Sequence, residues 1–129
     1  MAIKCVLRSK LSPSEDVSIL REVEVLSALK HKYICPLIDF FPEEECYFIV
    51  MELMFGGDLF ERIGRKKSYT ERDVRSLCVK LLEAISHCHQ HNIAHSDIKP
   101  KNLLLAVSLF LSLVFFLLCL SSLSTNHAY

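Results

Sequence analysis

A polar segment near residue 100 carries three side-chain types that together could handle a phosphoryl group. The segment His95-Ser96-Asp97-Ile98-Lys99-Pro100-Lys101-Asn102 holds a carboxylate, an ammonium group and an amide between Asp97 and Asn102. A carboxylate can orient an attacking hydroxyl and accept its proton, and an ammonium group can neutralise a moving phosphoryl group. An amide oxygen can bind Mg²⁺. On these residues alone, a polar turn without chemistry after a helix remains the alternative.

The element that leads into this segment is predicted to be a long amphipathic helix. Thr70, with Asp73 three residues later, is typical of a capped helix start. Asn92 interrupts the pattern and ends the helix near His91. The apolar positions recur at helical spacing: they are Val74, Leu77, Cys78, Leu81, Leu82, Ile85 and Cys88.

The first half of the chain alternates strand and helix signals. Residues 1–7 alternate as a short strand, and Ser12, Pro13 and Glu15 predict a capped helix that runs to about residue 30. Two β-prone runs, at 34–41 and 47–53, flank a charged turn and predict an antiparallel hairpin. Gly56-Gly57 ends the second run, and a short helix follows from 58 to 64.

Taken together, these segments resemble the catalytic domain of serine/threonine protein kinases. The loop at 95–102 is similar to the kinase pattern H-R-D-L-x-x-x-N, and Ala2-Ile3-Lys4 resembles the strand motif V-A-I-K. Phe48-Ile49-Val50-Met51-Glu52-Leu53 looks like the hinge between the two kinase lobes. Gly56-Gly57-Asp58-Leu59-Phe60-Glu61-Arg62-Ile63 is most similar to the calcium/calmodulin-dependent group.

The resemblance implies a role for each matching residue. Asp97, Lys99 and Asn102 would be catalytic, with Asn102 also the metal ligand, and the cofactors would be ATP and Mg²⁺. Lys4 would hold the ATP phosphates and pair with Glu22, Met51 would lie behind the adenine, and Leu104 would lie beneath it. The complete set of implied nucleotide-binding residues is Ala2, Lys4, Glu22, Met51, Glu52, Met54, Asp58 and Leu104.

The expected fold is α+β, a partial two-lobe protein kinase followed by an apolar C-terminal helix. Residues 1–105 would form the kinase part, with 1–53 in the small lobe and hinge and 54–105 at the start of the large lobe. Residues 106–129 would form the tail. A chain of 129 residues is about half the length that a complete kinase domain needs, so we expect a fragment cut at both ends.

The resemblance predicts an ATP-dependent serine/threonine kinase. Departures from the family pattern predict that this chain is inactive by itself. Ser96 stands where the family has Arg, and Lys101 stands where Glu is common. No Gly-rich loop precedes Lys4, and neither Asp-Phe-Gly nor Ala-Pro-Glu follows Asn102. The alternative is a non-catalytic kinase-like protein that binds partners through exposed apolar helix faces.

The tail from Leu103 to Leu120 is uncharged over eighteen residues and contains nine leucines. This length is just enough for a transmembrane helix. The alternatives are a buried helix, or read-through sequence that does not belong to the domain. The location is accordingly expected to be cytoplasmic, or membrane-associated if 103–120 inserts.

Composition excludes several other classes. With 15 basic and 15 acidic residues and no basic stripe, we expect no nucleic-acid partner, and the partners would be ATP and a protein substrate. The six cysteines lack a C-x-x-C pair and are read as buried free thiols. His87 and His91 could share a helix face, but no suitable further ligand completes a metal site.

Overall fold

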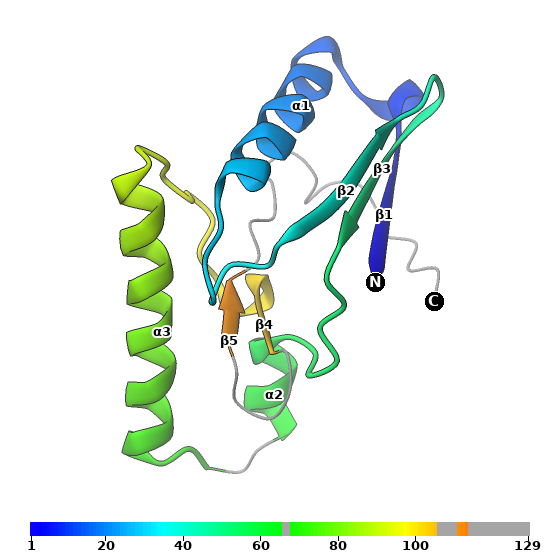
Figure 1. Ribbon diagram of the computed structural model, residues 1–129. Coiled ribbons are helices and arrows are strands. Elements are labelled where there is room, and N and C mark those ends of the chain that lie inside the picture. The colour runs from blue at the N-terminus through cyan, green and yellow to red at the C-terminus, as the bar shows by residue number, and fades with distance from the viewer. Residues whose placement is uncertain (66–67, 106–110, 114–129) are drawn as a thin grey trace.

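The computed structural model describes residues 1–65, 68–105 and 111–113, the last three by their backbone only. The chain forms a three-stranded sheet with one helix across it, and a second group of elements around a long helix (Figure 1). The expected α+β class is confirmed in this part of the chain. The elements are β1 (Ala2–Leu7), a 3₁₀ turn (Arg8–Lys10), α1 (Pro13–Ala28), β2 (Leu37–Pro42), β3 (Cys46–Met51), α2 (Leu59–Arg65), α3 (Glu71–Gln90), a second 3₁₀ turn (Pro100–Asn102), β4 (Leu103–Leu105) and β5 (Leu111–Leu113).

Both long helices begin at the predicted caps. The Ser12 hydroxyl accepts a hydrogen bond from the Glu15 amide, while the Glu15 carboxylate accepts one from the Ser12 amide. Thr70 and Asp73 form the same reciprocal pair at the start of α3. Each pair satisfies two amides that a helix start leaves without an intrahelical partner, so the sequence signal and the observed boundary coincide.

The sheet has the order β1–β3–β2, and both pairings are antiparallel. Its inner face packs against α1 and forms the first core, because Val6, Tyr47 and Ile49 meet Ile19 there. Tyr47 is almost fully buried and donates its hydroxyl proton to the Asp16 carboxylate at 2.7 Å. This hydrogen bond satisfies the polar end of a ring that otherwise lies among apolar side chains.

The second core lies around α3 and joins residues from distant parts of the chain. Its buried members are Leu29, Ile34, Leu59, Ala84, Cys88, Leu103 and Leu105. The predicted stripe of α3 is covered only in part: Leu77, Leu81 and Ile85 pack against this core. On the outer side, Val74, Val79 and Leu82 are 47%, 48% and 63% exposed.

The expected apolar C-terminal helix is wrong where the structure describes that segment. Leu103–Leu105 and Leu111–Leu113 are antiparallel strands, with Leu104 opposite Ser112. The strand at 103–105 is fixed by its surroundings: Leu105 accepts a hydrogen bond from the Gly56 amide at 2.7 Å and donates one to the Gly57 carbonyl at 2.9 Å. An apolar run without period is compatible with either state, and here tertiary pairing decides.

Residues 106–110 and 114–129, which hold the remainder of the predicted tail, lie outside the described residues. Within the described ranges, none of the helices combines the length and the apolar character needed to cross a bilayer.

Candidate functional site

The loop that carries the predicted catalytic residues leaves α3 through a sharp turn. Asn92 adopts a positive φ of 58°, a conformation that asparagine tolerates better than most residues. The next amide, of Ile93, donates to the Cys88 carbonyl at 2.9 Å, and the Ile93 side chain packs on the second core. The turn thus directs residues 94–102 back across the end of the helix towards β4.

Within this loop, two predicted site residues converge on the carboxylate of a third, Asp97. Lys99 Nζ lies 2.8 Å from Asp97 Oδ2, and Asn102 Nδ2 lies 2.9 Å from the same oxygen. Asn102 also donates to the Asp97 backbone carbonyl at 2.8 Å and is itself buried. Because Asn102 is held in the core next to Leu103, it fixes Asp97 relative to β4.

The charges around Asp97 keep it ionised. The hydrogen bond from Lys99 has the largest effect and lowers the pKa of the Asp97 carboxyl; burial raises this pKa, and the hydrogen bond from Asn102 lowers it further. The neighbouring Ser96 adopts a positive φ of 61° and is exposed. A carboxylate with a lowered pKa is a weak base, so it is suited to orient a hydroxyl and to accept its proton late in a reaction.

A second group of predicted residues lies between the sheet and α1. Lys4 shares the inner face of β1 with Ala2 and Val6, opposite Ile49 in the register, and Glu22 is buried on the inner side of α1. Burial lowers the pKa of Lys4, and the negative charge of Glu22 opposes this shift. Lys4 and Glu22 are therefore electrostatically coupled across the first core.

The predicted hinge begins within β3, and the segment that follows it pairs with β4. The Glu52 amide donates to the Pro36 carbonyl at 3.4 Å, and the Cys35 thiol donates to the Glu52 carbonyl at 3.7 Å. Asp58 forms an isolated bridge with Leu104, and its carboxylate caps α2 through the Glu61 amide at 2.8 Å. Leu104 is thus brought beside the segment that follows the hinge. Met51, at the end of β3, and Met54, three residues later, are both half-buried.

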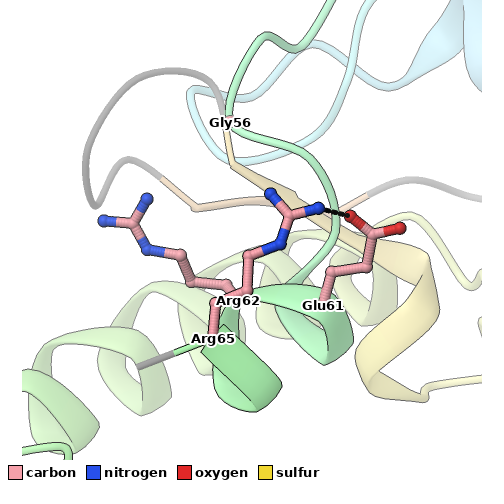
Figure 2. A pocket seen from close by; sticks show the side chains of 4 residues that line it. All are labelled: Gly56, Glu61, Arg62 and Arg65. Carbon is pink, nitrogen blue, oxygen red and sulfur yellow. Dashed lines mark hydrogen bonds and ion pairs between the residues drawn. The ribbon is translucent and has the colours of Figure 1, made fainter. Parts of the chain in front are cut away.

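A surface hollow of about 300 Å³ lies beside Gly56, on the side of α2 (Figure 2). Glu61, Arg62 and Arg65 complete its lining, and the dashed line in Figure 2 is the ion pair between Glu61 and Arg65 at 3.1 Å. None of the predicted site residues lines this hollow. The two groups described above, and not this hollow, hold the candidate chemistry.

Comparison with known proteins identifies the family. The family model described as "Protein kinase domain" matches residues 1–119 of the 129. This chain belongs to the protein kinase domain family. The match includes β4 and β5 and extends past residue 105, the predicted end of the kinase part.

Several curated kinases are similar to this chain. The calcium/calmodulin-dependent protein kinase type 1 of Caenorhabditis elegans is 42% identical over 80% of the chain, and a probable myosin light chain kinase of Dictyostelium discoideum is 38% identical over 81%. Myosin light chain kinase A of the same organism is 39% identical over 81%. These matches cover 29%, 26% and 35% of the respective relatives, so this kinase chain spans about a quarter to a third of their length.

Kinases in general use ATP with Mg²⁺. Mg²⁺ prefers carboxylates and phosphates in octahedral geometry. In residues 1–65 and 68–105, no group of three His, Cys, Asp or Glu side chains could hold a metal ion. The Asn102 amide nitrogen donates to Asp97, so its amide oxygen is the atom that could bind Mg²⁺. The role of Asn102 as a metal ligand stays a prediction.

The histidines of α3 form a stack that links this helix of the kinase domain to the loop after α1. The ring of His31 stacks on His87 with centroids 4.9 Å apart, and His87 lies 4.4 Å from His91. Beside them, Lys32 pairs with Glu83 at 2.8 Å. The tilted and stacked rings pack on one another, which is not the arrangement of ligands around a metal ion.

This stack predicts that the stability of the chain falls below about pH 6.5. Burial lowers the pKa of His31, helped by His87 and Lys32 and opposed by Glu83. The unfolded chain therefore binds more protons than the folded chain just below pH 6.5, so stability decreases as the pH falls and levels off below the folded pKa. Urea unfolding between pH 5 and pH 8 measures this dependence. His31→Gln should flatten the curve, whereas the exposed His89→Gln control should not. Equal slopes for both variants would contradict the prediction.

Two features of the site were not predicted from the sequence. In the sequence, Gly56 and Gly57 indicate the end of a strand and begin the segment that resembles the calcium/calmodulin-dependent group. In the structure, their backbones also pair with Leu105 of β4. Cys35, interpreted as a buried thiol, is a donor to the hinge carbonyl of Glu52. A glycine pair in a sequence indicates that another backbone segment can approach closely at that point. The sequence does not indicate which segment this is, because the partner, Leu105, lies far along the chain.

Proposed function

We propose that residues 1–105 form the nucleotide-anchoring and catalytic-loop part of an ATP-dependent serine/threonine protein kinase. The main support is the Asp97 carboxylate, which has both Lys99 and Asn102 within hydrogen-bond distance. The Asp-x-Lys-Pro-x-Asn form of this loop is similar to the serine/threonine type. The names of the relatives, which include calcium/calmodulin-dependent kinases, agree with that class.

In this proposal, each group has one task. Asp97 orients the serine or threonine hydroxyl of a protein substrate and accepts its proton as the new bond to phosphorus forms. Lys99 neutralises charge on the transferred phosphoryl group, and Asn102 fixes the loop. Lys4, held by Glu22, contacts the phosphates of ATP.

The adenine is proposed to lie against the segment that follows β3. Met51 and Leu104 would bound the base, and the backbone of Glu52 and Met54 would hydrogen-bond its edge. Asp58 would lie near the ribose, and Ala2 would lie above the base. The pairing of Gly56, Gly57 and Asp58 with β4 supports this arrangement, because it brings Leu104 next to the hinge.

We further propose that the 129-residue chain does not transfer phosphate by itself at a measurable rate. The family carries a metal-binding Asp after the catalytic loop, and residues 98–129 contain no Asp or Glu. Without this carboxylate, charge neutralisation at the phosphates is incomplete. The alternative function, a non-catalytic kinase-like partner protein, is favoured by the exposed Val74, Val79 and Leu82 on α3.

Nucleotide binding tests the proposal directly. Titration of a fluorescent ATP analogue into the full chain should show saturable binding, and Lys4→Met should weaken it about tenfold, the effect of losing one charged hydrogen bond. Lys10→Met removes an exposed lysine on the 3₁₀ turn and serves as the matched control. Binding that is absent in the full chain, or equal in both variants, would refute the nucleotide site.

A radiometric transfer assay separates the two parts of the proposal. The full chain and Asp97→Asn should both give background labelling of a basic protein substrate. Labelling by the full chain that Asp97→Asn abolishes would overturn the predicted inactivity and would support Asp97 as the catalytic base.

A further inference from the structure

The pairing of β1 with β3 brings two cysteines together on the outer face of the sheet. In the register, Leu7 lies opposite Cys46 and Cys5 lies opposite Phe48, so Cys5 and Cys46 are diagonal neighbours. Paired residues share a face, and Val6 and Tyr47, one position along, point into the first core. The two thiols therefore lie on the side of the sheet that α1 does not cover.

The two thiols are neighbours on this face and differ in exposure. The Cys5 thiol contributes to a raised pKa of the Cys46 thiol, and both are free cysteines. Cys5 is exposed, whereas Cys46 is half-buried at the first position of β3. A reagent from solution thus reaches Cys5 first, with Cys46 positioned behind it.

We propose that Cys5 and Cys46 form a dithiol site that reacts with low-molecular-weight disulfides and closes into a reversible cross-strand disulfide. In the first step, the Cys5 thiolate attacks glutathione disulfide, forms a mixed disulfide and releases one glutathione thiolate. In the second, the Cys46 thiolate attacks Cys5 Sγ and releases the second glutathione. Two protein thiols are oxidised and one glutathione disulfide is reduced to two thiols, so electrons and protons balance.

The surroundings of Cys46 make the second step dependent on pH. Burial raises the pKa of the Cys46 thiol, as do the neighbouring Cys5 thiol and the carboxylates of Glu43 and Glu45 in the adjoining turn. Arg8, the nearby cation, is hydrogen-bonded to the backbone of this turn. Because the attacking species is the thiolate, the rate of disulfide closure should rise about tenfold for each unit by which the pH increases, as long as the pH stays below the thiol pKa.

The geometry also accounts for reversibility. Diagonal neighbours in a sheet have Cα atoms about 7–8 Å apart, slightly beyond the usual disulfide range of about 4.4–6.8 Å. Closing the bond requires the adjoining ends of β1 and β3 to approach, and a strained bond is more readily reduced. This inference does not depend on nucleotide binding, so it can fail or hold separately from the proposed function.

The test treats the full chain with glutathione disulfide and maps the products by mass spectrometry after double digestion at Lys/Arg and at Glu. The expected product joins fragment 5–8 to fragment 46–52, which digestion at Glu45 separates from Cys35. Forming this link at pH 8 should be faster than at pH 7, and dithiothreitol should remove it. The cross-linked chain should melt on the order of 5 °C higher than the reduced chain.

Serine variants assign the order of events. Cys46→Ser should stop at a glutathione adduct on Cys5, and Cys5→Ser should give no linked fragment. Cys78→Ser, at an exposed cysteine on α3, should leave the link intact. A wild-type chain that keeps glutathione on Cys5 and yields no linked 5–8/46–52 fragment would overturn the proposal. This outcome is read on the wild-type chain, so it does not depend on whether a variant folds.

Discussion

Gly56→Ala is expected to destabilise the chain by on the order of 3 kcal/mol, a large share of the stability of a small domain. A Cβ atom at this position would lie 2.3 Å from the Leu105 carbonyl oxygen and 2.6 Å from the Leu105 Cβ. Because backbone cannot move aside as a flexible side-chain end can, the Gly56 segment and β4 must separate. That separation breaks two backbone hydrogen bonds and draws Leu105 from the second core.

Gly64→Ala in α2 is the matched control, because a Cβ there meets nothing within 4 Å. Replacing a glycine inside a helix by alanine should stabilise it by about 0.5–1 kcal/mol. Urea unfolding followed by circular dichroism measures both variants. A Gly56→Ala midpoint equal to that of the wild type would show that β4 is not fastened to the hinge as described.

Lys4→Met is expected to cost about 3 kcal/mol in unfolding free energy, while adding Glu22→Leu should restore most of the loss. Glu22 is only 9% exposed, so without the opposite charge of Lys4 its carboxylate remains in an apolar core. Glu22→Leu alone should cost less, because the longer Lys4 side chain can turn its ammonium group to solvent. Replacing both partners by apolar groups removes the buried charge altogether.

The double-mutant cycle of these variants measures the coupling. Additive losses in the double variant would mean that Lys4 and Glu22 do not interact. The double variant has a second use: it should fold and yet bind the fluorescent ATP analogue about tenfold more weakly than the wild type. It therefore separates loss of the nucleotide contact from loss of the fold.

The elements that the sequence predicts correctly are those specified by local signals. Ser12 with Glu15 and Thr70 with Asp73 fix helix starts through contacts three residues apart, and the charged turn at 42–45 fixes the hairpin. The loop residues Asp97, Lys99 and Asn102 are close in sequence, so their meeting on one carboxylate also follows from a short segment.

The features that the sequence does not predict depend on partners far along the chain. Leu103–Leu105 has no hydrophobic period, and its strand conformation comes from Gly56 and Gly57, almost fifty residues earlier. Cys5 and Cys46 carry no motif, and only the register of two strands makes them neighbours. The stack of His31 on His87 likewise requires the packing of a loop against α3.

The composition of the two cores has a consequence for how the chain folds during synthesis. The first core uses residues 6–49, so the sheet and α1 can assemble once β3 has emerged from the ribosome. The second core joins Leu29 and Ile34 to Leu103 and Leu105, contacts of long sequence separation that form slowly. We therefore expect a nascent chain with an early, protease-resistant amino-terminal half and a carboxyl-terminal half that stays cleavable until Leu105 has been translated and has paired with Gly56.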